Sequence, residues 1–137
     1  MDDCIFCRIV RGEAPCHRIY EDADVLVFLD LFPVSAGHTL VIPKAHAQDL
    51  FDLAEESAEA IARVTRRIAH AIDEAIRPDG LMIMQLNRAA AGQTVFHYHT
   101  HLIPRAEGDS LALHTRVPGD PDALAGMAAR LAEALGE

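Results

Sequence analysis

The chain has 137 residues and a mass of 14.9 kDa, and 50% of its residues are hydrophobic. A chain of this mass exposes roughly 7,000 Å² when folded against roughly 21,600 Å² when unfolded, which suits one globular domain. The composition therefore excludes a disordered chain, a disulfide-stapled miniprotein and a pair of domains. We expect a single domain over residues 1–137.

Charge and cysteine content indicate which partners and which compartment to expect. The 21 acidic and 12 basic residues give a formal net charge of −9, and the basic residues form no cluster that could neutralise phosphates or an anionic membrane. No apolar run is long enough for a transmembrane helix, and the start of the chain lacks the basic region of an export signal. Three cysteines argue against a disulfide framework. We expect a cytoplasmic protein that binds neither nucleic acid nor membrane.

The first part of the chain predicts a short helix and three strands. Residues 4–10 form one helical turn, which Gly12 and Pro15 close. The segments 18–20 and 25–31 are rich in β-formers and flank an acidic hairpin connection, and Pro33 ends the second of them. A third strand over 39–43 ends at Pro43.

The second part begins with an amphipathic helix over 54–76, which Pro78 and Gly80 break. Its apolar stripe consists of Ile61, Val64, Ile68, Ile72 and Ile76. A strand over 81–86 follows, and it is apolar on both faces, so one face should meet the helix and the other a second subunit.

A small-residue loop over 87–93 leads to a fifth strand over 94–103, which Pro104 stops. Residues 105–118 look irregular, and Asp120 then caps a final helix that runs to about Leu135. This order of elements predicts an α+β domain. We expect a five-stranded antiparallel sheet with one long central helix, a short N-terminal helix and a C-terminal helix.

Three histidines alternate in the predicted fifth strand. Side chains alternate between the faces of a strand, so His97, His99 and His101 should project from one face while Tyr98 and Leu102 point to the other. Such a row fits either a metal site or a phosphate site with a histidine nucleophile. The segment 87–106 holds no acid to serve a catalytic metal, and the turn at 91–94 offers donors to a phosphate, so the phosphate site is favoured.

The segment His97-Tyr-His-Thr-His-Leu-Ile103 resembles the signature of the histidine triad (HIT) family of nucleotide-binding proteins and hydrolases, with Thr100 as its weakly apolar position. The resemblance covers residues 4–106, is closest to the bacterial branch that keeps a cysteine pair, and leaves 107–137 as an extension with a helix. It rests further on Cys4-Ile-Phe-Cys-Arg-Ile, Tyr20-Glu-Asp, Phe28-Leu-Asp30, Gly37-His-Thr-Leu-Val-Ile-Pro-Lys-Ala-His46, Asn87 and Ala91-Gly-Gln-Thr-Val-Phe-His97.

The resemblance implies a mechanism and its residues. In the family the middle histidine, here His99, attacks the α-phosphorus of a nucleotide to give a covalent nucleotidyl-histidine that water cleaves. His101 would donate to phosphate oxygens, and Asp30 would accept both ribose hydroxyls. The remaining nucleotide-binding positions would be Gln93 and Thr94 at the phosphate and leaving group, Asn87 and His38 as supports, and Phe6, Phe28 and Leu31 around the base.

The resemblance also implies a metal. Cys4-x-x-Cys7 alone supplies only two ligands, and in the cysteine-containing branch two histidines complete the set, here His46 and His97. A Cys₂His₂ set has no open position, so the zinc would be structural, and no catalytic metal is required. Two inert thiols under the sheet are the alternative.

The function that these residues imply is hydrolysis of purine nucleoside phosphoramidates or other nucleotide conjugates, such as AMP conjugates, by a homodimer. A dinucleoside polyphosphate hydrolase or a nucleotidyl transferase would use the same intermediate. A nucleotide-binding regulatory module is the alternative that is not an enzyme.

Overall fold

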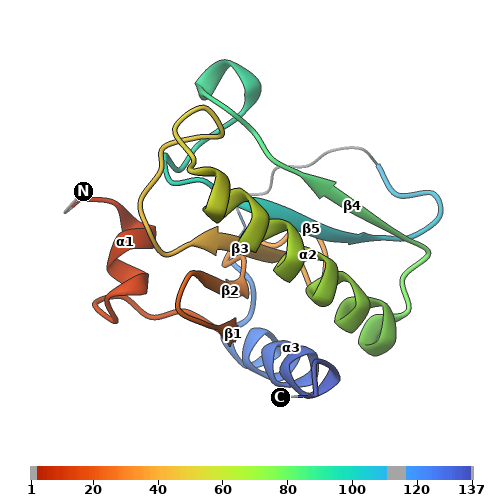
Figure 1. Ribbon diagram of the computed structural model, residues 1–137. Helices are drawn as coiled ribbons and strands as arrows, with labels where there is room; N and C mark the ends of the chain where they lie inside the picture. Colours follow the sequence, from red (N-terminus) through yellow and green to blue (C-terminus); the bar gives the residue numbers. More distant parts are fainter. Residues whose placement is uncertain (1–2, 111–116, 137) are drawn as a thin grey trace.

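The structure is a computed structural model, and it describes residues 3–110 and 117–136. Five strands form one antiparallel sheet in the order β1-β2-β3-β5-β4, which confirms the predicted α+β class (Figure 1). The elements are α1 (Ile5–Val10), β1 (Arg18–Glu21), β2 (Val25–Leu29), β3 (Thr39–Pro43), α2 (Glu55–Ile76), β4 (Gly80–Met84), η1 (Ala89–Ala91), β5 (Thr100–Arg105) and α3 (Pro121–Ala134).

Two short aspartate turns set the bounds of β2. Asp22 Oδ1 accepts hydrogen bonds from the backbone N–H groups of Asp24 and Val25, 2.8 Å each, and so closes the β1–β2 hairpin. Asp30 Oδ1 accepts from Phe32 N–H at 2.8 Å. This turn ends β2 at Leu29, two residues before the predicted end, because the local side-chain bond competes with the ladder.

Helix α2 has the predicted length and apolar stripe. Ala54 is its N-cap, and Glu55 and Glu56 in the first turn complement the helix dipole. The helix ends because Arg77 precedes a proline and cannot stay helical; it adopts a left-handed conformation at φ 52° instead. Gly37, at φ 92°, lies against the end of α2, where a Cβ would clash with the Ile76 side chain.

The predicted strand over 94–103 is wrong at both ends, since β5 begins at Thr100 and continues through Pro104 to Arg105. Within 94–99, Tyr98 bonds to the loop after β3 and not to a neighbouring strand: its N–H donates to Ala47 O at 2.7 Å. Pro104 is tolerated within the strand because the ladder with β3 ends at Leu102, so no residue of β3 pairs there.

The sheet has a hydrophobic cluster on each face (Figure 1). Helices α2 and α3 pack on one face, where α3 contributes Leu124, Ala128 and Leu131. Helix α1 packs on the other face through Phe6, against Leu26, Phe28, Leu40 and Ile42. The C-terminal extension is therefore part of the core on the face away from α1.

Asp120 caps α3 as predicted, since its Oδ2 accepts from Ala123 N–H at 3.0 Å and Pro121 takes the first helical position. Of the segment predicted to be irregular, residues 111–116, with His114, lie outside the described residues. None of the helices in the described part of the chain is long and apolar enough to cross a membrane.

Strand β4 is an edge of the sheet, paired only with β5 among the described strands. The strand is apolar as predicted. Leu81 packs on the cluster under α2, but Ile83 is 51% exposed. A free edge with an exposed apolar side chain is a ready surface for pairing with another chain.

Candidate active site

The three histidines keep the predicted alternation although only His101 lies in the strand. Tyr98 and Leu102 belong to the cluster under α2 and α3, whereas the rings of His97 and His99 contact Phe6 of α1 on the opposite face, at centroid distances of 5.8 and 5.3 Å. The rings of His99 and His101 are 4.8 Å apart. The histidines therefore share the face that α1 covers.

His99 is held as a nucleophile would need to be. Its Nδ1–H donates to the backbone carbonyl of His97 at 2.7 Å, which leaves the lone pair on Nε2. Burial lowers the pKa of His99, so its ring is neutral near pH 7. A neutral imidazole with a free Nε2 lone pair is the reactive form.

His101 is held in the opposite tautomer by His38. The backbone N–H of Val34 donates to Nδ1 of His38 at 3.0 Å, so a neutral His38 carries its proton on Nε2. That Nε2–H lies 2.9 Å from His101 Nδ1 and donates to it. His101 then carries its own proton on Nε2, where it can donate to a ligand.

Asp30 lies beside this pair, at the end of β2. Its Oδ2 is 3.5 Å from His38 Nε2, and burial raises the pKa of its carboxyl group while the Phe32 N–H partly opposes the shift. A half-buried carboxylate close to His101 is well placed to accept hydrogen bonds from a sugar.

The predicted base-pocket residues have different environments. Phe6 and Phe28 are buried and pack edge to face at a centroid distance of 5.4 Å. Leu31 is 44% exposed, and its backbone carbonyl accepts from Gly119 N–H at 2.8 Å. The structure thus joins the two aromatic residues to the histidines through Phe6 and leaves Leu31 at the surface.

Gln93 serves the protein rather than pointing to an open site. Its Nε2 donates to the carbonyls of Gln48 and Val95, at 2.7 and 3.0 Å, and its Oε1 accepts from Arg88 N–H at 2.6 Å. Both amide protons are used, so Gln93 holds the loops in place while its exposed neighbour Thr94 remains the candidate for direct phosphate contact.

Asn87 joins the same two loops. Its Oδ1 accepts from Leu50 N–H and from Gln85 Nε2, both at 2.8 Å, and its Nδ2 donates to Gln85 Oε1 at 2.9 Å. The loop over 46–53 is therefore tied to the loop over 87–94, which sets the position of the segment that leads to His97.

Cys4, Cys7, His46 and His97 meet as the predicted metal set, with all ligand atoms within 4.8 Å of one another. His97 Nδ1 is 3.4 Å from Cys4 Sγ and 3.6 Å from Cys7 Sγ, and His46 Nδ1 is 3.2 Å from Cys7 Sγ. A tetrahedral zinc with ordinary bond lengths separates sulfur from nitrogen by about 3.6 Å, so the set fits this metal.

The protonation of these ligands supports the same fit. His97 Nε2–H donates to Pro43 O at 2.8 Å, which leaves the Nδ1 lone pair directed to the cysteines. Burial raises the pKa of the Cys7 thiol, so a cation is needed to hold a thiolate there.

A second group, Asp30, His38 and His101, also lies within 4.8 Å. Here the Val34 N–H occupies His38 Nδ1 and puts a proton on the Nε2 that would have to bind the metal. The second group is thus a hydrogen-bond chain.

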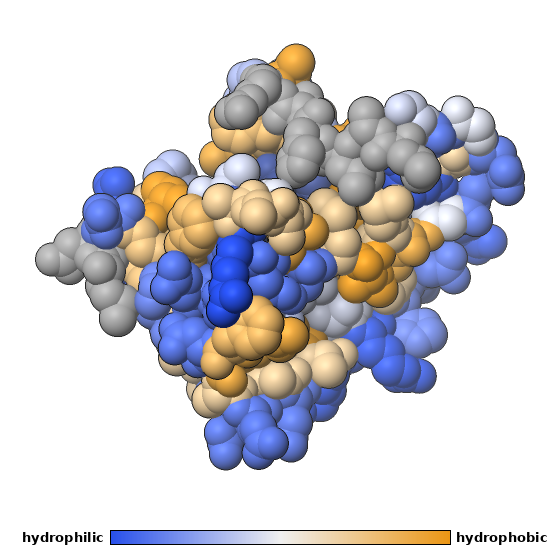
Figure 2. All heavy atoms as spheres, turned by 90° about the horizontal axis from the view of Figure 1, so that it is seen from above, coloured by the Kyte–Doolittle hydropathy of each residue, from blue (hydrophilic) through white to orange (hydrophobic). Residues whose placement is uncertain are grey.

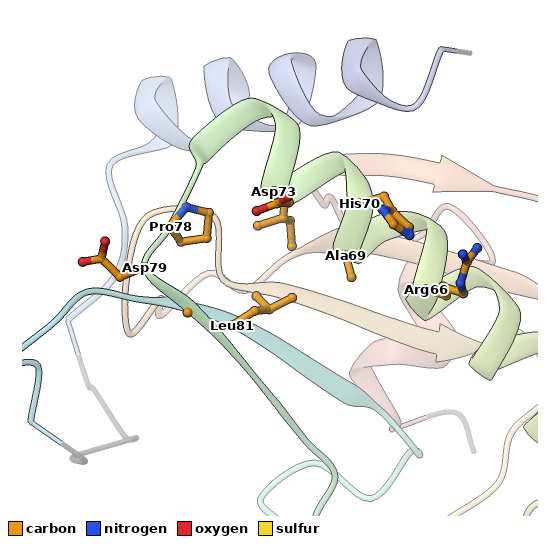
Figure 3. Close-up of a pocket in the computed structure, with 9 residues that line it drawn as sticks. Arg66, Ala69, His70, Asp73, Pro78, Asp79 and Leu81 are labelled. Carbon is orange, nitrogen blue, oxygen red and sulfur yellow. The ribbon is translucent and has the colours of Figure 1, made fainter.

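The resemblance implies a backbone carbonyl as the hydrogen-bond acceptor of the nucleophile, but the sequence does not identify which backbone groups serve the site: the carbonyls of Pro43 and His97 and the N–H of Val34. Backbone groups leave no trace in residue identity, so no pattern in the sequence could have named them. The site also differs from the hollow of about 340 Å³ between α2 and the start of β4, which Ala69, His70, Asp73 and Leu81 line (Figure 3).

Comparison with known proteins gives one family. The HIT domain family matches residues 11–108. The Bacillus subtilis protein called Protein hit is 39% identical over 138 residues, covering 98% of this chain and 95% of its own. The Arabidopsis thaliana protein Adenylylsulfatase HINT3 is 44% identical over 110 residues, or 80% of this chain and 56% of its own length.

Among solved structures, the zinc-bound histidine triad family protein of Mycobacterium smegmatis is 44% identical with a TM-score of 0.86. The match covers 98% of this chain and 94% of that one.

The buried His38 predicts a specific acid sensitivity. Burial, and secondarily the nearby His99, lowers the pKa of His38 from 6.5 to about 4, so the unfolded chain binds more protons between these pH values. The free energy of unfolding should therefore fall as the pH is lowered from 6.5 towards 4. We would measure the free energy of unfolding by urea at several pH values in this range. It should depend less steeply on pH for His38→Asn, whose side chain cannot titrate, than for wild type. The same pH dependence in both proteins would contradict the prediction.

Proposed function

The chain belongs to the HIT domain family, and on this premise we propose that it hydrolyses purine nucleotide conjugates, with nucleoside phosphoramidates as the favoured substrates, through a nucleotidyl-His99 intermediate. The observation that carries the proposal is the pair of opposite tautomers: His99 presents a lone pair beside a proton donor on His101. A lone pair on His99 can attack a phosphorus atom while the N–H of His101 donates a hydrogen bond to an oxygen of the same phosphate.

In the first step His99 Nε2 attacks the α-phosphorus, and the bond from phosphorus to the leaving group breaks. The leaving amine or oxygen takes both bonding electrons and a proton from the solvent. His101 Nε2–H donates to a non-bridging oxygen and stabilises the charge that develops there. In the second step water attacks the same phosphorus and releases a proton to the solvent, the P–N bond to His99 breaks, and AMP leaves with His99 neutral again.

The remaining predicted residues would bind the nucleotide. Asp30 would accept both ribose hydroxyls beside His101, and Thr94 would donate to the phosphate. Phe6 and Phe28 would contact the base, with Leu31 at its outer edge. Asn87 and Gln93 would act by holding the two loops, and His38 by fixing the proton of His101.

Two other activities share this intermediate. A dinucleoside polyphosphate hydrolase would differ in the leaving group, and a nucleotidyl transferase in the acceptor. The Arabidopsis relative is named an adenylylsulfatase, which puts an adenylyl donor with an anionic leaving group within the family. A regulatory module would bind AMP and turn over none of these donors.

We also propose that Cys4, Cys7, His46 and His97 hold a structural zinc, as the zinc-bound relative from Mycobacterium smegmatis supports. When bound, the metal would supply four bonds that fix α1 against the segment carrying His97. The three free cysteines suit a reducing compartment such as the cytoplasm.

We further propose that two copies pair through β4, which continues the sheet across a two-fold axis with α2 beside it. Ile83 is exposed on this edge strand. The hollow between α2 and the start of β4 adjoins the same strand (Figure 3).

His99→Ala should lower the rate of AMP release from adenosine 5′-phosphoramidate by about 10³-fold or more, because no other group in the proposal forms the intermediate. AMP affinity should stay within a few-fold, since the ring contributes little to binding. Chromatography of timed incubations and calorimetry measure the two quantities, with His17→Ala as the control. A variant that keeps most of its rate would remove the nucleophile assignment, and a wild type that binds AMP without turnover would favour the regulatory module.

Metal analysis of the purified chain should find about one zinc per chain, and a Cys4→Ser/Cys7→Ser variant should hold none. The variant should also unfold at lower urea concentration, because binding to the folded state alone adds to stability. Cys16→Ser, which lies outside the set, is the matched control. Wild-type protein without zinc after purification in the absence of chelators would refute the site.

Sedimentation should give a mass of roughly twice 14.9 kDa at micromolar concentration. Ile83→Arg should shift the mass to that of one chain, since it buries a charge in the proposed interface. Arg8→Gln on the exposed side of α1, which packs over β2 and β3, is a control for charge. A wild-type monomer would rule the interface out.

A further inference from the structure

Arg88 has a backbone conformation that is unusual for any residue but glycine. Its φ of 77° and ψ of 158° fall in a region that side chains disfavour, and such residues persist only where the surroundings hold them. Gln93 holds the Arg88 backbone through two hydrogen bonds. Its Oε1 accepts from Arg88 N–H at 2.6 Å, and its backbone N–H donates to Arg88 O at 3.1 Å. Strain of this kind points to a function for the side chain.

The Arg88 side chain stacks on an exposed aromatic ring. Its Cζ lies 4.5 Å from the centroid of Phe51, and Phe51 itself is 71% exposed. The Arg88 side chain is 69% exposed, and the Asp49 carboxylate lies 3.8 Å from its Nε, beyond hydrogen-bond distance. The stack orients a cationic plane at the surface and leaves it accessible.

The stack borders the proposed nucleotide site. Arg88 follows Asn87 directly and is bonded to Gln93, the neighbour of Thr94. Phe51 follows Leu50, whose N–H donates to Asn87 Oδ1. The view of Figure 2, from the side of these two loops, shows hydrophobic and strongly hydrophilic side chains interleaved on this face. Hydrogen bonds thus join the stack to the loop over 87–94 that carries Thr94.

From this geometry we infer that Arg88 and Phe51 form a subsite for an anionic leaving group that carries further phosphates. The inference rests on the proposed function and extends it to substrate class. Because the chain has a net charge of −9, it repels an oligophosphate at long range. A cationic side chain at the site is therefore needed to bind such a ligand. The planar guanidinium can donate two hydrogen bonds to one phosphate, and its stacking on Phe51 fixes the plane in advance.

The test compares two donors of the same adenylyl group, adenosine 5′-phosphoramidate and diadenosine tetraphosphate. Arg88→Gln should lower the ratio of kcat/KM for the tetraphosphate to that for the phosphoramidate by about tenfold, as one charge-assisted contact is lost. Arg63→Gln, which removes the same charge from α2, should leave the ratio within twofold. An unchanged ratio in Arg88→Gln, or an equal fall in Arg63→Gln, would overturn the subsite.

A second variant separates function from folding. Arg88→Gly removes the strain together with the guanidinium, so its Tm should be unchanged or higher while the ratio still falls. A lower Tm together with equal losses on both donors would mean that Arg88 only supports the loop, and would overturn the inference.

If wild type hydrolyses neither donor, the proposed function fails and the subsite is judged by binding. Calorimetry would then measure the Kd of ATP and of AMP. Arg88→Gln should raise the Kd of ATP about tenfold more than it raises the Kd of AMP. Equal effects on both nucleotides would overturn the subsite as well.

Discussion

One buried residue, His97, connects the parts of this site. Its ring has no exposed surface. Its Nε2–H donates to Pro43 O, its Nδ1 faces Cys4 and Cys7, and its backbone carbonyl accepts a hydrogen bond from His99 Nδ1–H. The proposed metal and the proposed nucleophile therefore share one residue, the ring serving the first and the backbone the second. A change in α1 can therefore reach His99 through the His97 peptide group as well as through Phe6, whose ring contacts that of His99.

The two tautomers of the site depend on backbone groups at both ends. The carbonyl of His97 puts the His99 lone pair on Nε2, and the N–H of Val34, through His38, puts the His101 proton on Nε2. The same Val34 N–H decides that Asp30, His38 and His101 form a hydrogen-bond chain although their spacing resembles a metal site. Ligand geometry alone does not identify a metal site; the positions of the protons must agree.

The sequence was sufficient for the strongly periodic elements and for the residues with distinctive chemistry. The stripe of α2, the aspartate cap of α3 and the pairing of Cys4 and Cys7 with His46 and His97 all follow from spacing or from the family resemblance, and the structure brings each together. It was insufficient where backbone bonding decides. The alternation over 94–99 looks like a strand, but Tyr98 bonds to Ala47 and leaves the ladder. Gln93 matches a phosphate ligand by position, yet its amide is used by the loops.

The sheet separates two sets of residues with different tasks. Helices α2 and α3 fill one face with the larger hydrophobic cluster, and α1 packs on the other (Figure 1). The rings of His97 and His99 lie on the α1 side, against Phe6. With His97, Phe6 and Phe28 as exceptions, the side chains that fold the domain are not those that would meet a substrate. Selection for a new leaving group could therefore act on the loops over 46–53 and 87–94 while selection for thermal tolerance acts on the helices, so adaptation in one trait need not compromise the other.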